Sequence, residues 1–205
     1  MQETMDISPY RQGLKTKILE TAMKDFMAKG IRAVKMDDVA SELCISKRTL
    51  YEIYENKELL LFEAVKAYYR NNEAVLETET RRCKNVMQVL LVIYRKKVDD
   101  FRRTNPVFYT DLVKYPKVLE FLEQQNQRMR NQSAKFIERG IDEGFFRSDL
   151  NYELTSKLFE AMGKYVMDSQ VYRQYGIEDI FRNIVFVSLR GICTTKGIEA
   201  LDKLK

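Results

Sequence analysis

Apolar residues recur at three- and four-residue intervals along most of this chain. Leu14, Ile18, Ala22 and Phe26 are spaced by four, and Gly30 follows them as a candidate helix C-cap. Two shorter helical patterns come next, over about residues 36–43 and 47–54. Such spacing places the apolar side chains on one face of each helix. The pattern therefore predicts three helices before residue 57, preceded by a polar arm at residues 1–9.

The remaining three quarters of the chain continue the same pattern. Further helices are expected over residues 57–80, 84–103, 116–143, 152–168 and 177–194. A shorter segment starts at Asn105-Pro106 and is broken at Tyr115-Pro116. Few segments alternate as strands do, and the chain holds only three Pro and eight Gly in 205 residues. These observations favour an all-α fold with about nine helices, in which a three-helix N-terminal domain precedes a C-terminal helical bundle.

The two short helical patterns are joined by a tight turn. Ser46 directly precedes the second pattern, where its hydroxyl can accept a hydrogen bond from a free N–H group of the helix. Helices of about seven residues are not stable alone in water, so the two must dock. A docked pair of this kind is a helix-turn-helix, which places its second helix in the DNA major groove.

The second short helix has two different faces. At 100° per residue, Leu50 and Ile53 point inward, whereas Lys47, Arg48, Tyr51 and Glu52 share one arc. Two cations and a phenol on one arc suit contacts with phosphates and base edges. The alternative interpretation is an ordinary solvated helix face. The capped turn between two short helices favours the DNA-binding interpretation.

At this point the sequence resembles a known family, the tetracycline-repressor-like (TetR) transcriptional regulators. The resemblance covers about residues 12 to 60. It is carried by Ile18, Ala22, Phe26, Gly30, the run Met36-Asp37-Asp38-Val39-Ala40, the run Ile45-Ser46-Lys47-Arg48-Thr49-Leu50-Tyr51, Tyr54 and Lys57-Glu58-Leu59. It implies an all-helical homodimer with a DNA-binding domain at residues 1–56 and an effector-binding and dimerisation domain at residues 57–205.

The resemblance also implies roles for individual residues in contact with DNA. Thr49, Tyr51 and Lys57 are expected to contact phosphates, and Lys47 and Arg48 to reach base edges or phosphates. Tyr54 either packs in the core with its hydroxyl reaching a phosphate or only packs. The full set expected to serve DNA binding is Lys35, Ser46, Lys47, Arg48, Thr49, Tyr51, Tyr54 and Lys57.

Three positions depart from the family's pattern. Cys44 stands at a turn position that is often Gly, and a positive φ there would disfavour cysteine. Arg48 replaces a frequent Gly and adds a potential DNA contact. Lys35 stands where Ser or Thr commonly caps the first helix, and it brings a cation near the expected DNA backbone. Oxidation of Cys44 is one interpretation of its thiol, and a small apolar filler is the simpler one.

Residues 58–205 hold nineteen of the 23 aromatic side chains. They either form ordinary core or line a pocket for an apolar or amphipathic effector. The residues expected to line an effector pocket are Tyr94, Phe108, Tyr109, Phe121, Phe159, Met162 and Tyr165.

The last two expected helices carry broad apolar surfaces with small residues among them. Core packing explains part of this surface, and pairing in a two-fold dimer would bury the surplus. The residues expected at a dimer interface are Leu158, Ala161, Ile184, Val187, Ser188 and Gly191.

Composition narrows the function further. The net charge is +5, but residues 1–57 hold ten Lys and Arg against nine Asp and Glu, so the DNA-binding prediction depends on placement. No histidine is present, which excludes His-based catalysis and His metal sites. The three cysteines are far apart, as expected for a reducing cytoplasm. The densest apolar run, 89–94, is far shorter than the roughly 20 residues of a membrane span.

Taken together, the sequence predicts a ligand-responsive repressor that binds a pseudo-palindromic operator as a homodimer. Its partners are double-stranded DNA and a small apolar or amphipathic effector, and no cofactor, metal or membrane is expected. A second interpretation keeps the DNA binding but has no effector, with control that is constitutive or exerted by a protein partner. Catalysis is disfavoured, because the sequence has no histidine, no cluster with metal-ligand spacing and no Gly-rich phosphate loop.

Overall fold

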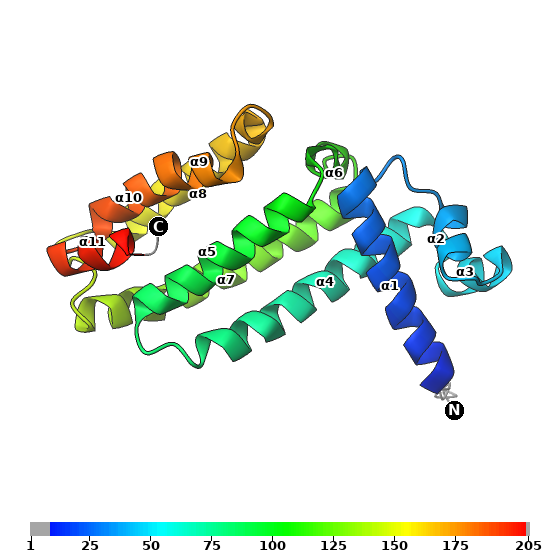
Figure 1. The fold of residues 1–205 in the computed structure, drawn as a ribbon, viewed down its shortest axis with the longest axis horizontal. Helices are drawn as coiled ribbons and strands as arrows, with labels where there is room; N and C mark the ends of the chain where they lie inside the picture. The colour runs from blue at the N-terminus through cyan, green and yellow to red at the C-terminus, as the bar shows by residue number, and fades with distance from the viewer. Residues whose placement is uncertain (1–8, 204–205) are drawn as a thin grey trace. The chain divides into compact units, whose positions relative to one another are not determined.

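The computed structural model describes residues 9–203, and within them the chain is helical with a single isolated β-bridge. The all-α prediction is confirmed (Figure 1). The elements are α1 (Pro9–Lys29), α2 (Met36–Glu42), α3 (Lys47–Ile53), α4 (Lys57–Thr80), α5 (Val86–Arg103), α6 (Pro106–Leu112), α7 (Pro116–Asp142), α8 (Tyr152–Asp168), the 3-10 turn η1 (Val171–Arg173), α9 (Ile177–Ile180), the π-helical η2 (Phe181–Val185), α10 (Phe186–Ile192) and α11 (Thr195–Asp202). Apart from Pro9, which begins α1, the expected polar arm lies outside the described residues.

The described residues form two compact units. The N-terminal unit comprises residues 9–75 and 103–123, and the C-terminal unit comprises residues 76–102 and 124–203. Helix α6 and the first turns of α7 thus pack with α1–α3. The division into functional domains at residue 56 concerns roles rather than packing, and it stays a prediction.

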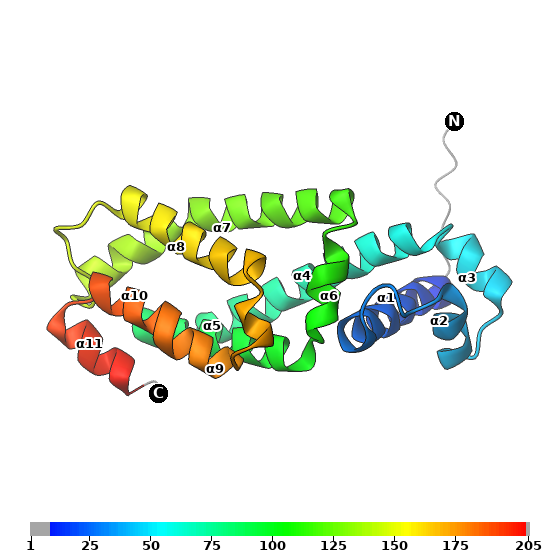
Figure 2. The ribbon, with the colours of Figure 1, turned by 90° about the horizontal axis from the view of Figure 1, so that it is seen from above.

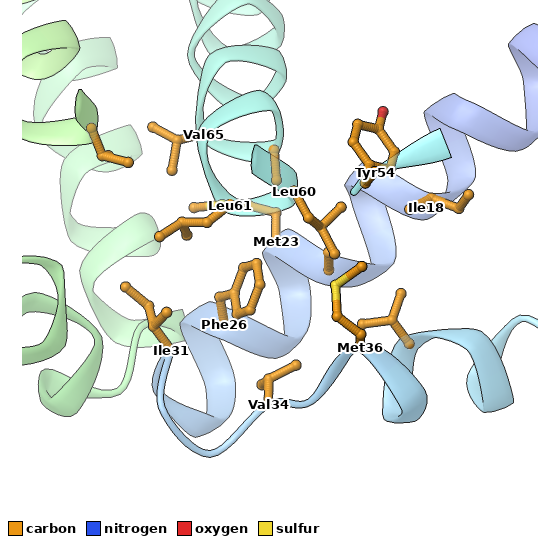
Figure 3. Packing of buried hydrophobic residues seen from close by; sticks show 14 of the residues in the cluster. Ile18, Met23, Phe26, Ile31, Val34, Met36, Tyr54, Leu60, Leu61 and Val65 are labelled. Carbon is orange, nitrogen blue, oxygen red and sulfur yellow. The ribbon is translucent and has the colours of Figure 1, made fainter. Parts of the chain in front are cut away.

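The core of the N-terminal unit follows from the spacing of apolar residues. Ile18, Ala22 and Phe26 of α1 are completely buried, as their four-residue interval requires. Figure 3 shows Ile18 and Phe26 on α1, which faces α4, with Met36 of α2 extending toward the same cluster. Gly30 ends α1 at a φ of +85°, and its N–H donates to the Phe26 carbonyl oxygen over 3.0 Å. The predicted C-cap is therefore confirmed.

The C-terminal unit ends differently from the expected single helix over residues 177–194. That segment contains α9, a π-helical turn and α10, and Cys193 then leaves the helix with φ −87° and ψ 148°. Cys193 forms the β-bridge with Phe146, and the Thr194 N–H donates to the Phe145 carbonyl oxygen over 3.0 Å. The bridge to a loop about fifty residues earlier ends the helix. Thr194 then caps α11, which the sequence analysis did not anticipate.

Candidate DNA-binding site

The turn between α2 and α3 is a Schellman motif. The Cys44 N–H donates to the Ser41 carbonyl oxygen over 3.1 Å, and the Ile45 N–H donates to the Ala40 carbonyl oxygen over 3.0 Å. Cys44 adopts a φ of +52°, in the left-handed region that favours glycine. Its side chain is exposed, so it does not fill a space in the core. The turn thus has the geometry usual for glycine although it carries cysteine.

We expect Cys44→Gly to raise the free energy of unfolding by about 0.5–1 kcal/mol, because glycine avoids the left-handed penalty but loses more chain entropy on folding. Urea unfolding at equilibrium would measure the change. Cys44→Ala is the matched control, since alanine keeps a Cβ at the same φ and should bring no gain. An equal gain in both variants would show that the thiol, and not the backbone, is the source of strain.

Both short helices begin with hydrogen bonds that fix their first turns. Ser46 Oγ accepts the Thr49 N–H over 3.0 Å, which confirms the predicted cap of α3. The Thr49 hydroxyl lies 2.8 Å from Ser46 Oγ, so the two hydroxyls are bonded to each other. At α2, the N–H of Lys35 donates to Asp38 Oδ2 over 2.9 Å, while the Lys35 ammonium group is exposed. The Asp38 carboxylate in the first turn of α2 therefore provides this hydrogen bond. The Lys35 side chain cannot cap the helix, because an ammonium group cannot accept a hydrogen bond.

The two faces of α3 are separated as its helical angles predict. Leu50 is completely buried, whereas Lys47, Arg48, Tyr51 and Glu52 are all exposed. Lys47 Nζ pairs with Asp37 Oδ2 at 2.5 Å, and Arg48 Nε pairs with Glu52 Oε1 at 2.8 Å. Each hydrogen bond to a carboxylate raises the pKa of its cation. Because the pairs are exposed, water screens them strongly and an incoming phosphate can replace the carboxylates.

Two of the expected DNA contacts lie deeper than the others. Tyr54 is 6% exposed, and burial raises the pKa of its phenol to about 12. Lys57 Nζ donates to the carbonyl oxygens of Val34 over 2.7 Å and Arg32 over 3.3 Å. Partial burial lowers the pKa of this ammonium group. Lys57 therefore stabilises the loop at residues 30–35, which precedes α2. The spacing of residues in the sequence does not predict this role.

Comparison with known proteins agrees with this geometry. Residues 18–64 match the family model described as bacterial regulatory proteins, tetR family. That match spans α2, the turn and α3, together with the buried half of α1 and the start of α4. Residues 18–64 thus form a TetR-family DNA-binding domain.

Similarity to known transcriptional regulators extends along more of the chain. The transcriptional repressor KstR2 of Mycolicibacterium smegmatis is 23% identical over 145 residues, which are 67% of this chain and 70% of the relative. The structure of the ketosteroid transcriptional regulator KstR2 of Mycobacterium tuberculosis has a TM-score of 0.57 at 21% identity, over 88% of this chain and 95% of that one. A transcriptional regulator from Saccharomonospora viridis in complex with choline reaches 0.69 at 20% identity, over 89% and 99%. At these identities the solved structures show the fold alone.

The residues expected to line an effector pocket belong to both packing units. Phe108, Tyr109 and Phe121 lie in or against the core of the N-terminal unit. Tyr94 and Phe159 pack against the core of the C-terminal unit, Met162 is half-buried, and Tyr165 is 59% exposed. A pocket that uses all seven residues stays a prediction.

The residues expected at a dimer interface lie mainly on the surface of the C-terminal unit. No residue of α8 is buried, and Leu158 and Val187 are 60% and 61% exposed. Helices α8 and α10 lie beside one another (Figure 2), with Ser188 Oγ 3.3 Å from Met162 Sδ. Ala161 and Gly191 are exposed, and Ile184 and Ser188 are half-buried. The pairing of two chains through this surface stays a prediction.

Residues 9–203 hold no cluster of three or more Asp, Glu, His or Cys side chains arranged for a metal ion. Over the same residues, no helix has the length and hydropathy needed to cross a bilayer.

Proposed function

We propose that this protein is a transcriptional repressor that binds a pseudo-palindromic operator as a dimer and releases it when a small effector binds. The observation that carries the proposal is the exposed face of α3, where Lys47, Arg48 and Tyr51 stand on a helix capped by Ser46. Repression is supported by the KstR2 relative, which is itself a repressor. A cytoplasmic location follows from the proposed role.

We propose the same division of DNA contacts that the sequence suggested. In this proposal the phosphates are contacted by Thr49, Tyr51 and Lys57. The base edges or further phosphates are contacted by Lys47 and Arg48. Lys57 still has a third ammonium proton available after its two bonds to loop carbonyls. Lys35 adds an exposed cation at the start of α2. Binding should weaken steeply with salt, because each phosphate contact releases counterions from the DNA.

The exposed surface of α8 and α10 supports the dimer. An exposed apolar stripe runs along α8, because apolar residues recur there at four- and three-residue intervals. Its members are Leu154, Leu158, Ala161 and Tyr165. Val187 and Gly191 continue the exposed surface on α10. An identical stripe on a second chain is its natural complement in a two-fold interface. Such a dimer would present two α3 helices to successive major-groove faces, about 34–36 Å apart or a multiple of it.

Aromatic side chains support an apolar or amphipathic effector. Tyr94 packs its ring against Phe181 and Phe186, with centroids 5.1 Å apart in each case. Phe181 begins the π-helical turn, a feature common at functional sites. Two structural neighbours are named for a ketosteroid regulator and for a choline complex. Both an apolar ring system and a quaternary ammonium group can bind to aromatic faces.

Selection of genomic DNA fragments by the purified protein at about 150 mM salt tests the proposal, because non-specific binding is weak at that salt. We expect enrichment of an inverted repeat. Adding ketosteroids or choline to the recovered complex then tests release. Absence of any enriched sequence, before and after unfolding and refolding to remove a bound ligand, would contradict the proposed function.

Arg48→Ala should weaken operator binding about tenfold to hundredfold if the guanidinium makes a bidentate contact with guanine. The loss should concentrate at one base position, as measured by titrations with operators mutated at each position in turn. Arg70→Ala, which removes the same charge from the exposed surface of α4, is the control and should change affinity little. A uniform loss on every sequence would instead assign Arg48 to a phosphate.

A further inference from the structure

Helix α6 meets the loop that leads into the helix-turn-helix. Asp111 of α6 is only 5% exposed, and its Oδ2 accepts the backbone N–H of Arg32 over 2.8 Å. The two residues are 79 positions apart in the chain and belong to the same packing unit. A buried carboxylate that accepts a backbone bond is a strong anchor, because charged acceptors form shorter and stronger bonds than neutral ones.

The same peptide region is held from its carbonyl side by a cation. Lys57 at the start of α4 donates to the carbonyl oxygens of Arg32 and Val34. The negative charge of Asp111 raises the pKa of Lys57, against the larger lowering caused by burial. The N–H of Arg32 thus donates to the Asp111 carboxylate, and its carbonyl oxygen accepts a hydrogen bond from the Lys57 ammonium group. Residues 30–35 are fixed between α6 and α4.

Close packing brings α6 to this position. The Asn105 N–H donates to the Met27 carbonyl oxygen over 2.7 Å, and so satisfies one of the carbonyls that the end of α1 leaves free. A Cβ at Gly30 would lie 2.8 Å from Val107 Cγ1 and 3.3 Å from Asp111 Oδ2. Gly30 therefore serves both the positive φ at the end of α1 and the approach of α6.

We infer that Asp111 is a positioning residue for DNA binding, which acts by fixing the loop that sets α2 and α3 on α1. Residues 30–35 link α1 to Met36, where α2 begins, and Met36 also packs in the core that α1 forms. Loss of the Arg32 anchor frees the loop and widens the range of orientations that α2 and α3 take while Met36 and Leu50 stay in the core. The proposal rests on operator binding through α3.

The test uses the full chain with Asp111→Ala, which removes the acceptor, and Asp111→Asn, whose amide oxygen can accept the same N–H. Leu112→Ala is the matched control, because Leu112 is the next residue of α6 and is 8% exposed in the same core. Hydrogen exchange measures protection of the Arg32 amide, titration measures operator affinity, and thermal unfolding measures stability. A purely structural role would move only stability.

We expect Asp111→Ala to lose Arg32 protection and to weaken operator binding by about tenfold or more, as loss of a hydrogen bond to a charged group suggests, at a temperature where it remains folded. Asp111→Asn should keep the protection and most of the affinity. Leu112→Ala should lower the melting temperature and leave Arg32 protected.

Two results would overturn the inference. One is a wild-type Arg32 amide that exchanges as fast as an exposed loop amide, a result that requires no variant to fold. The other is an affinity loss in Leu112→Ala equal to that in Asp111→Ala at matched stability. Failure of the proposed function has a separate signature, since the wild-type protein would then select no operator while Arg32 remained protected.

Discussion

Leu50→Ala should lower the free energy of unfolding by about 2–5 kcal/mol, the usual cost of truncating a buried leucine. Leu50 is completely buried and lies at the centre of a seven-residue helix. Such a short helix has no stability of its own, so packing must hold it in place. The loss is a large share of the roughly 5–15 kcal/mol that keeps a domain folded. Operator binding should therefore disappear together with the structure of α3.

Urea unfolding monitored by circular dichroism, together with operator titration, would measure both effects of Leu50→Ala. Glu55→Ala is the control, because Glu55 is exposed just beyond the end of α3 and should change stability little. Operator binding lost on all sequences alike would fit unfolding of α3. Altered sequence preference in a fully stable Leu50→Ala protein would refute the assignment of Leu50 to the core.

Val187→Glu should dissociate the proposed dimer and weaken operator binding about a hundredfold or more. Val187 is 61% exposed on α10, and a carboxylate there would be buried without a partner when two chains pair. A monomer loses the gain in affinity, about 10²–10⁴, that comes from linking two binding modules. Sedimentation velocity would measure the association state and titration the affinity. The monomer should keep its helical content.

Val113→Glu is the matched control for Val187→Glu. Val113 is 64% exposed but belongs to the N-terminal unit, whereas α8 and α10 belong to the C-terminal unit. The substitution adds the same charge and should leave the association state unchanged. A dimer that survives Val187→Glu, or one that dissociates equally with Val113→Glu, would place the interface elsewhere.

The sequence reveals some features of this site and not others. Helix positions in the first 60 residues were predictable, because Ile18, Ala22 and Phe26 repeat at the helical period and are all completely buried. The cap at Ser46 was predictable for the same reason, since a cap acts within three residues. The exposed arc of α3 follows from the angle between residues once Leu50 faces inward.

Other features of the site depend on the path of the chain through space. The Asp111 carboxylate meets an N–H group 79 positions away, and Lys57 meets carbonyl oxygens 23 and 25 positions away. Periodicity contains no information about such pairs, because it reports only which side of one helix is apolar. Phe108 and Tyr94, which the sequence analysis grouped in one expected pocket, lie in different packing units, and that pocket stays a prediction.

The sequence by itself thus determined the helical class, the helix-turn-helix and the face of α3 that is exposed, because these depend on interactions between residues about three to five positions apart. The tertiary structure alone decided how the loop before α2 is anchored, where the last long helix ends and which apolar side chains remain exposed on α8 and α10. Each of these depends on which distant segment packs against the residue, and a residue's own neighbours in sequence do not specify that segment.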